Sequence, residues 1–436
     1  MNSSFTRREF LAASAAALGS MSFAHLRLQK DPEPIVAGFI GTGAQGQMLL
    51  GKCLRVPGVR FAGICDIYEP HLNKALQMCG GTAKGYKDYR ELLEDKSIQA
   101  VLIATPLYLH APMTIAALEA GKHVFCEKTM ARWPEQAKAM ARTVDRTRKW
   151  LQIGHQRRAS ALYQHAYDMV AKKKLVGTLT QVRARWHRNG SWRRNVPPEY
   201  ERLLNWRLYK EYSGGLMAEL GSHQIHLVNW FTDSNPIAVT GFGGIDYWKD
   251  GREVFDNVSV VYEYPNGLKV VYTSITTNQF DGYGEHFMGD KGTLEITVDK
   301  GLLFKEPAAE APAWSALAQK EQVGGKEAIV LDASATKKRV EGEKHGETNL
   351  QKSDVDDYQS ELNDFFLKTV LRNERPLCDH VEGLRTCVAI LGANTAMERR
   401  QRFDFSPADF QYDTQAHVPG RQQVAAATPQ ERMSPR

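Results

Sequence analysis

Two hydrophobic patterns alternate along the first part of the chain. Short apolar runs, such as Ile35 to Ile40, Ile98 to Ala104 and His123 to Cys126, are separated by segments whose apolar residues lie three or four positions apart. The runs have the length of buried strands, and the segments between them have the spacing of amphipathic helices. Residues 31–155 are therefore predicted to form a Rossmann-type α/β domain, a doubly wound parallel sheet with helices on both faces.

The pattern changes after residue 155. A predicted helix over 161–172 is followed by strand-like runs over 179–187, 239–247, 257–264, 268–275 and 293–298. Pro265-Asn266-Gly267 is a hairpin signal between two of them. We expect residues 156–414 to form an α+β domain with a large open antiparallel sheet, closed by helices over 356–371 and 381–399. The polar stretch at about 304–351 is expected to be an insertion with little core.

The ends of the chain differ from the rest. Ser4-Phe5-Thr6-Arg7-Arg8-Glu9-Phe10-Leu11 is a twin-arginine motif, and the Ala-rich segment after it ends in Ser22-Phe23-Ala24, a small-x-small cleavage pattern. Residues 1–30 are predicted to be a Tat export signal and linker, which makes the Tat machinery a partner and the periplasm the destination. The alternative is a basic tail with a chance arginine pair. Residues 415–436 are expected to be a disordered tail.

Composition excludes several classes of protein. A length of 436 residues predicts two domains, and a net charge of +6 is too small for this length to argue for nucleic-acid binding. No apolar run approaches the length of a membrane-spanning helix. The six cysteines lack zinc-like spacing, so no metal site is expected, while a disulfide stays open. Because an open sheet face usually needs covering, a homo-oligomer is expected.

One stretch carries a recognisable chemistry. Gly41-Thr42-Gly43-Ala44-Gln45-Gly46 fits G-x-G-x-x-G between a predicted strand and a predicted helix, which is the context of a dinucleotide-binding turn. Asp66 ends the next strand, twenty residues after Gly46, where a carboxylate can accept hydrogen bonds from the adenosine ribose. No arginine adjoins Asp66, so NAD is favoured over NADP. The alternative is a glycine turn that binds nothing.

Two further groups of residues are suited to proton transfer. Lys128, in Glu127-Lys128-Thr129, closes a strand and can hold a substrate hydroxyl, although an exposed strand-end lysine is the alternative. Glu219 and His223 are four residues apart, so on a helix they share a face, and the carboxylate can orient the imidazole. Alternatives there are a purely structural pair, or a metal site that includes His226.

An aromatic and basic stretch follows the first strand of the second domain. It contains Trp186, Arg188, Asn189, Trp192, Arg193 and Arg194, with Asn205-Trp206-Arg207 and Tyr209 soon after. Aromatic walls with a few converging polar groups are typical of a ligand pocket, and tryptophan faces beside arginine and asparagine donors suit carbohydrate. The alternative is a solvated loop that uses tryptophan for packing.

Together, GFIGTGAQG, Asp66, Ala104-Thr105-Pro106, CEKT and GGLMAELGSH resemble the Gfo/Idh/MocA family of sugar and polyol oxidoreductases, over most of Ile35 to Arg399. The resemblance implies that Lys128 acts on the reacting hydroxyl and that His223 is the proton acceptor. Thr129 stands where the family has proline, Glu219 where it has aspartate, and His226 where it has an acid, so the substrate geometry is expected to differ. The proline replacement is expected to loosen the turn after Lys128.

These patterns and the resemblance define the predicted site. The expected catalytic residues are Lys128, His223, Glu219 and Tyr212. The expected cofactor-binding residues are Gly41, Thr42, Gly43, Ala44, Gln45, Gly46, Asp66, Thr105, Pro106, His110, Glu127, Lys128, Gln156, Trp206 and Arg207. The expected substrate-binding residues are Lys128, His155, Arg157, Trp186, Trp192, Tyr209, His223 and His226.

The stretches GHQRR, WHRN and YSGGLMAELGSHQ are closer still to an exported branch that includes the NAD-dependent glycosidases of glycoside hydrolase family 109. In those enzymes a ring hydroxyl is oxidised, the glycosidic group is eliminated, water is added and the ketone is reduced again. Two functions follow: an oxidoreductase acting on a secondary hydroxyl of a sugar with tightly bound NAD, or a glycosidase in which Tyr212, His155 or Glu219 is a further acid or base. A binding protein without turnover is a weaker third, because Lys128 and His223 are both present.

Overall fold

The structure is a computed structural model that describes residues 33–297, 300–309, 315, 318–331 and 356–413. Residues 35–436 cluster as one unit, separate from residues 1–34. The predicted export signal and the predicted C-terminal tail lie outside the described residues, and so does much of the predicted insertion. No helix in the described ranges is both long and apolar enough to cross a membrane.

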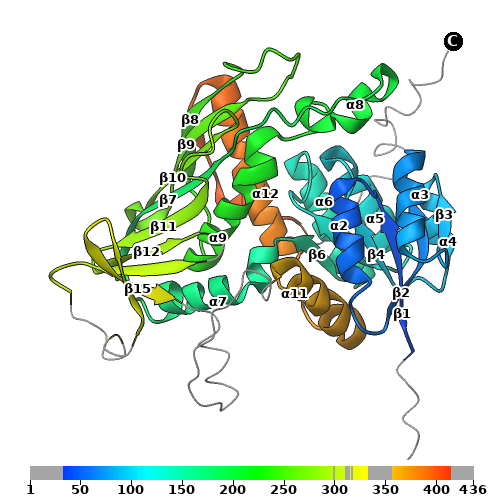
Figure 1. Cartoon of the computed structure of the whole chain (residues 1–436), viewed down its shortest axis with the longest axis horizontal. Coiled ribbons are helices and arrows are strands. Elements are labelled where there is room, and N and C mark those ends of the chain that lie inside the picture. Colours follow the sequence, from blue (N-terminus) through cyan, green and yellow to red (C-terminus); the bar gives the residue numbers. More distant parts are fainter. Residues whose placement is uncertain (1–32, 298–299, 310–314, 316–317, 332–355, 414–436) are drawn as a thin grey trace, which may run out of the picture. The chain divides into compact units, whose positions relative to one another are not determined.

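The first sheet is a six-stranded parallel sheet in the order β3-β2-β1-β4-β5-β6, which confirms the predicted Rossmann arrangement (Figure 1). Its elements are β1 (Ile35–Ile40), α2 (Ala44–Cys53), β2 (Val59–Cys65), α3 (Glu69–Met78), β3 (Lys84–Tyr86), α4 (Tyr89–Glu94), β4 (Ala100–Ile103), η2 (Leu107–Leu109), α5 (His110–Glu119), β5 (His123–Glu127), α6 (Pro134–Thr147) and β6 (Leu151–Gly154).

The centre of this sheet determines where a ligand binds. All six residues of β1 are buried, as a strand covered by helices on both faces requires. β1 pairs with β2 on one side and with β4 on the other, so the strand order reverses between β1 and β4. Ligands of such sheets bind outside the carboxyl ends of the strands at this reversal. Gly41 directly follows β1, and Thr105 lies two residues after β4. Both residues therefore lie where the cofactor is expected to bind.

The second sheet has ten strands in the order β14-β15-β13-β12-β11-β7-β10-β9-β8-β16. Its strands are β7 (Leu179–His187), β8 (Ala238–Gly244), β9 (Asn257–Glu263), β10 (Lys269–Ile275), β11 (Tyr283–Gly289), β12 (Gly292–Ile296), β13 (Gly301–Lys305), β14 (Lys320–Val323), β15 (Lys326–Leu331) and β16 (Phe403–Asp404). The sheet is mostly antiparallel, as predicted, and its central neighbours β7 and β10 are parallel.

Two differences from the predicted second domain stand out. The strand β11 was not predicted, although it lies in the middle of the sheet between β12 and β7. The expectation of little core in the polar stretch is wrong for residues 320–331, because they form the hairpin β14–β15 and bury Ala328, Ile329 and Leu331. Alternating polar residues concealed this hairpin, since only one of its faces is buried.

The remaining helical segments follow β6 along the chain. They are η3 (Gln156–Ala159), α7 (Ala161–Tyr167), η4 (Asp168–Lys172), η5 (Pro198–Tyr200), α8 (Glu201–Leu204), η6 (Trp206–Leu208), η7 (Met217–Gly221), α9 (Ser222–Thr232), η8 (Pro265–Gly267), α11 (Asp357–Asp364), η10 (Phe365–Val370), α12 (His380–Arg399) and η11 (Pro407–Phe410). The long helix α12, orange in Figure 1, contacts α9 and β8 as well as α6. The helix α11 contacts both η3 and α2. Helix α12 also contacts β6, so it packs on both sheets, whereas α11 packs on the first domain.

The turn between β1 and α2 depends on two glycines. Gly41 has a φ of +86°, and an added Cβ would lie 2.7 Å from Cγ2 of Thr105. A Cβ on Gly46 would collide with the carbonyl oxygen of Gly41. The helix therefore packs directly on the turn that precedes it, which brings its first N–H groups to the crevice.

This packing predicts opposite effects for two substitutions in the same helix. Gly46→Ala is expected to lower the free energy of unfolding by about 1–3 kcal/mol, because the methyl group has no space against Gly41. Gly51→Ala is the control: its methyl group would meet only the Met78 side chain, at an ordinary 3.5 Å, and is expected to stabilise the helix by up to about 1 kcal/mol. Urea unfolding of both variants measures the difference, and equal effects would contradict the packing argument.

Candidate active site

The glycine turn and Asp66 form one hydrogen-bonded unit at the sheet edge. Asp66 accepts a bond from the backbone N–H of Thr42 at 2.7 Å and one from its hydroxyl at 3.1 Å. Its other oxygen accepts from the backbone N–H of Tyr68 at 2.8 Å. Asp66, which lies directly after β2, is thus fixed beside the turn, as a carboxylate that binds a ribose must be.

The crevice fits a dinucleotide on three observations. The N-terminus of α2 has no capping side chain and no acidic residue in its first turn, so its N–H groups are left for an anion. A Cβ on Gly43 would meet nothing nearer than the His71 ring, at 3.8 Å, which leaves room for a close backbone approach. The buried hydroxyl of Thr105 finds no hydrogen-bond partner within the described residues.

Lys128 lies immediately after β5, which ends at Glu127. Its ammonium donates a hydrogen bond to the backbone oxygen of Glu219 at 3.0 Å and lies 4.0 Å from the Glu219 carboxylate. The buried Glu127 accepts bonds from Gln45 at 2.9 Å and from the Lys128 N–H at 3.2 Å, and burial raises its pKa. An ammonium has three donors, so Lys128 retains donors for a substrate.

The turn after Lys128 is anchored, contrary to the expectation that the loss of proline loosens it. The hydroxyl of Thr129 donates to the backbone oxygen of Ala218 at 2.9 Å, and Thr129 is 2% exposed. A proline could not make this bond. The substitution therefore ties the strand-end lysine directly to the segment that carries Glu219.

Glu219 pairs with the cations Arg207 and Lys128, whereas the sequence predicted a pair with His223. Arg207 donates to its carboxylate at 2.8 Å, and burial, which would raise its pKa, is outweighed by the charges of Arg207 and Lys128, so the pKa is lowered. The structure records no bond between Glu219 and His223 in the residues it describes. Glu219 lies in the π-helical turn Met217–Gly221, and its carboxylate binds the Arg207 guanidinium instead.

His223 lies at the centre of a buried group of rings. Its ring centroid is 5.5 Å from that of Trp186 and 5.8 Å from that of His155. Burial lowers the pKa of His223 well below its ordinary value, and the charges of Lys128 and Arg157 add to the shift. The imidazole is therefore neutral at neutral pH and can accept a proton.

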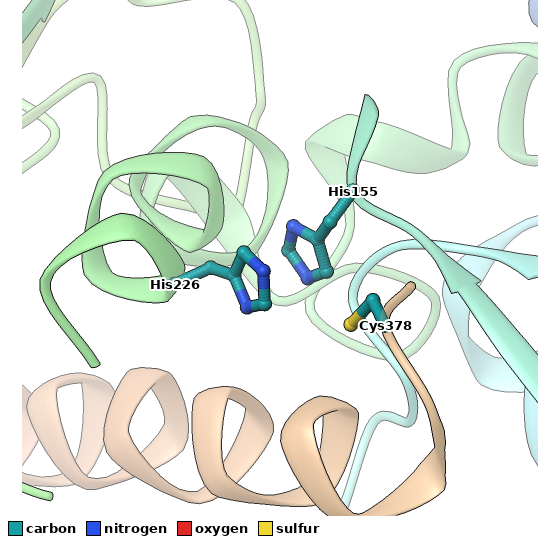
Figure 2. Close-up of side chains that lie close together, drawn as sticks. All are labelled: His155, His226 and Cys378. Carbon is teal, nitrogen blue, oxygen red and sulfur yellow. The ribbon is translucent and has the colours of Figure 1, made fainter. Parts of the chain in front are cut away.

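His155 and His226 stack face to face, with Cys378 beside them (Figure 2). Their centroids are 4.1 Å apart and their planes differ by 12°. Imidazole lone pairs lie in the ring plane, so nearly parallel rings cannot both direct a nitrogen at one ion. Burial lowers the pKa of His155 to about 3 and also that of His226. The arrangement is that of packed neutral rings rather than of a metal centre.

A polar cluster that sequence reasoning missed lies behind Trp186. Tyr283, whose ring centroid is 4.9 Å from that of Trp186, receives a hydrogen bond from Tyr163 at 3.1 Å, and Tyr163 also lies 3.0 Å from a carboxylate oxygen of Glu285. Glu285 is fully buried, and this burial raises its pKa to about 7. Because β11 was not predicted, nothing in the sequence placed Glu285 near the site.

Arg157, a predicted substrate residue, connects this cluster to α11. Its guanidinium lies 5.1 Å from the ring centroid of Tyr283 and donates to Asp357 at 2.5 Å. Gln156 is buried beside it at the start of η3. Arg157 thus already has an anionic partner, and its charge lies close enough to lower the pKa of His223, after the effects of burial, Lys128 and His155.

Two other predicted residues, His110 and Tyr212, have structural neighbours. The ring of the buried His110 lies between the backbone oxygens of Thr129, at 2.8 Å, and Thr105, at 3.1 Å. Burial lowers the pKa of His110 to about 4, so the neutral ring donates to only one of these two acceptors. Tyr212 packs on Tyr108, with the ring centroids 4.9 Å apart, and the structure records no contact of Tyr212 with Lys128 or His223 in the described residues.

The predicted aromatic wall divides into two parts. Trp186 faces His223, whereas the hydroxyl of Tyr209 donates to Glu201 at 2.6 Å, away from the reacting groups. Trp192 has a φ of +64°, an uncommon backbone conformation for a bulky residue. The guanidinium of Arg188 lies over the Trp192 ring, 5.3 Å from its centroid. The guanidinium of Arg207 lies over the Trp206 ring, 4.3 Å from its centroid.

The fold and the site define an oxidoreductase with an NAD-binding Rossmann domain. Residues 35–155 match the oxidoreductase family with an NAD-binding Rossmann fold, and residues 163–301 match the GFO/IDH/MocA C-terminal domain. The two matches cover more than half of the 436 residues. The chain belongs to the Gfo/Idh/MocA family.

Several known proteins are similar to it. An inositol 2-dehydrogenase of Rubrobacter xylanophilus is 26% identical over 64% of this chain and 76% of its own. A glycosyl hydrolase family 109 protein of Stenotrophomonas maltophilia is 37% identical over 28% and 29%, and a levoglucosan dehydrogenase of Pseudarthrobacter phenanthrenivorans is 33% identical over 37% and 40%. A levoglucosan dehydrogenase solved with NADH and levoglucosan shares the fold, with a TM-score of 0.69 at 18% identity over 85% of this chain and 99% of that one.

The burial of Glu285 predicts a specific pH dependence of stability. Its pKa is about 7 in the folded protein and near 4.3 in an unfolded chain, so the folded state binds the proton more tightly and loses this advantage as the pH rises through 7. Relative to Glu285→Gln, the native protein is expected to lose about 2–3 kcal/mol of unfolding free energy between pH 5 and pH 8.

Urea unfolding at four pH values in this range measures that difference. Glu327→Gln, at an exposed carboxylate on β15 that pairs with Lys320, serves as the control and is expected to change the pH dependence less. Parallel curves for the native protein and Glu285→Gln would contradict the raised pKa.

Proposed function

We propose that the protein oxidises a secondary hydroxyl of a sugar or sugar derivative to a ketone, or carries out the reverse reduction, with a tightly held NAD. One observation carries the proposal: Lys128, directly after β5, donates its ammonium to the segment that leads into α9, where the buried His223 imidazole is affected by the Lys128 charge. A cation that polarises a hydroxyl and a base that accepts its proton are the two groups that such a reaction requires.

The proton is removed by His223. Burial keeps the ring neutral, and its neighbours Trp186 and His155 hold it by ring contacts. Since Glu219 does not reach the imidazole, packing alone determines the orientation of the ring. The positive charges around it oppose formation of the imidazolium, so His223 is a weak base that needs an acidified hydroxyl.

Lys128 acidifies that hydroxyl. Its ammonium is 14% exposed and is directed by the Glu219 backbone oxygen, which leaves donors for the substrate oxygen. The carboxylate of Glu219 is occupied by Arg207, and this ion pair prevents Glu219 from neutralising Lys128 completely. The turn Gly41–Gly46 would hold NAD, which would supply the hydride acceptor or donor for the carbon that carries this hydroxyl.

Several features support the substrate and cofactor classes. The relatives named for their substrates act on inositol and levoglucosan, a polyol and a sugar derivative. Trp186 offers an aromatic face at the reacting groups. Asp66, fully bonded to the turn, favours a free ribose hydroxyl over a 2′-phosphate, so we propose NAD rather than NADP. Export by the Tat pathway and assembly into a homo-oligomer remain predictions.

A glycosidase is the second candidate, and the similarity to a glycosyl hydrolase family 109 protein favours it. Net hydrolysis needs proton transfers beyond the first deprotonation. Glu285, with a pKa of about 7, lies in the cluster behind Trp186 and is suited to exchange protons near neutral pH. A cofactor that is never released also suits a reaction without net redox change.

The first experiment separates these two functions. Protein purified without added cofactor is denatured, and the supernatant is analysed for NAD and NADH by mass spectrometry; about one equivalent per chain is expected. The native protein is then incubated with nitrophenyl glycosides in deuterated water and, separately, with free sugars and polyols. Net NADH or bound-NAD reduction with a free sugar supports the oxidoreductase. Nitrophenol release with deuterium beside the anomeric carbon, and no net NADH, supports the glycosidase instead.

Substitution of the lysine tests the mechanism that both functions share. Lys128→Ala is expected to lower kcat about 10²–10⁴-fold, since it removes the group that acidifies the hydroxyl. Lys138→Ala on α6, which pairs only with Glu135, is the control and is expected to keep full turnover. Unfolding curves confirm that both variants are folded. Full turnover by folded Lys128→Ala would rule out both mechanisms.

A further inference from the structure

A segment of the second domain contacts the nucleotide side of the first. Residues 188–209, here called the crossing segment, follow β7 and include η5, α8 and η6 (Figure 1). Within it, the ring of Tyr200 meets the ring of Tyr68 edge-on, with centroids 5.0 Å apart. Tyr68 is two residues after Asp66 and donates its backbone N–H to that carboxylate. The crossing segment therefore reaches the ribose end of the crevice.

The segment has a defined shape although it contains little regular structure. Asn205, which is 2% exposed, accepts a bond from the backbone N–H of Arg194 at 2.7 Å and donates to its backbone oxygen at 3.0 Å. Glu201 receives bonds from Tyr209 at 2.6 Å and from Asn205 at 2.9 Å. These bonds fix the backbone of Arg194 in place, so little ordering entropy remains to be lost on binding a ligand.

Two neighbouring arginines of the segment differ in their partners. Arg193 pairs with Glu201 and with Asp250. The guanidinium of Arg194 has no hydrogen bond or ion pair among the residues that the structure describes, and it lies near a second cation, because the charge of Arg207 adds to burial in lowering its pKa. Arg207 is already bound to Glu219, so Arg194 is the arginine of the two whose charge is left for an anionic ligand.

The position of Arg194 identifies the anion. Its charge contributes to the lowered pKa of His71, after the larger effects of burial and Asp66. His71 is also the residue nearest to a Cβ placed on Gly43, at 3.8 Å. Asn205 fixes the backbone of Arg194 in the same segment whose Tyr200 packs on Tyr68. This contact brings the segment to the nucleotide side, toward Gly43 and the uncapped start of α2, where the glycine motif brings a pyrophosphate.

We propose that the crossing segment is a cofactor clasp, in which Arg194 pairs with the pyrophosphate of NAD while Tyr200 covers the adenosine end against Tyr68. The inference rests on the proposed function, since it concerns the same nucleotide. It adds two binding residues from the second domain and assigns the slow release of the cofactor to them.

Two other anionic ligands fit the position of Arg194 less well, a 2′-phosphate on the ribose and an anionic group on the substrate. A 2′-phosphate on the ribose would need Arg194 to act against Asp66, whose oxygens are already bonded. An anionic group on the substrate would place Arg194 beside His223, whose pKa is affected instead by Lys128, His155 and Arg157.

The test measures cofactor release from the full chain. Protein loaded with NADH is mixed with excess NAD, and the decay of bound-nicotinamide fluorescence gives the release rate. Arg194→Gln is expected to release NADH about 10–100-fold faster, the usual effect of losing a charge-assisted bond to phosphate. Binding of ADP-ribose is expected to weaken by the same factor, and binding of adenosine, which has no phosphate, is expected to be unchanged. Tyr200→Ala is expected to weaken adenosine and NADH alike.

Arg183→Gln, an exposed arginine on β7, is the control for general charge effects and is expected to leave all rates unchanged. Equal release rates for native protein and Arg194→Gln would overturn the clasp. It would also be overturned if Arg194→Gln weakened the binding of NADPH alone, or of an anionic sugar alone, relative to the native protein. Native protein that binds none of these nucleotides would overturn the proposed function itself, which keeps the two failures distinct.

Discussion

The site depends on the contact that ties Lys128 to the backbone of Glu219. Lys128 ends a strand of the first sheet and Glu219 lies in the helical segment that covers the second, so this bond joins the two halves of the chemistry. Thr129 repeats the connection one residue later through the oxygen of Ala218. Buried charges are tolerated only when they are paired, and Arg207 completes the pairing by binding the Glu219 carboxylate.

This junction explains why the acid is retained although it does not orient His223. Without Glu219, Lys128 and Arg207 would face each other across a largely buried space, and their repulsion would separate the strand end from the covering helix. Glu219 therefore sets the distance between the ammonium and the imidazole. Glu219 positions Lys128 through its backbone oxygen and balances the charges of Lys128 and Arg207 through its carboxylate.

The sequence was most informative where the structure is local. The strand, glycine turn and helix at Ile35–Cys53 follow from residue spacing, because a tight turn and close packing require glycine at fixed positions. The sequence paired Glu219 with His223 from their i,i+4 spacing, and that spacing gives no information about Arg207, the cation that the Glu219 carboxylate binds. Glu285 was missed because its strand begins Tyr283-Gly284-Glu285, in which a glycine and a buried acid hide the usual alternation.

The electrostatics of the pocket resolve an apparent conflict in the mechanism. Lys128 and Arg157 both lower the pKa of His223, so the charges that acidify a hydroxyl also weaken the base that must deprotonate it. The transfer is feasible because the negative charge that develops on the substrate oxygen offsets the same cations that oppose the imidazolium. His223 is a poor base in the empty pocket, and its basicity rises only as the alkoxide forms beside Lys128. Under the proposed function, proton removal is thereby coupled to the presence of a correctly placed substrate.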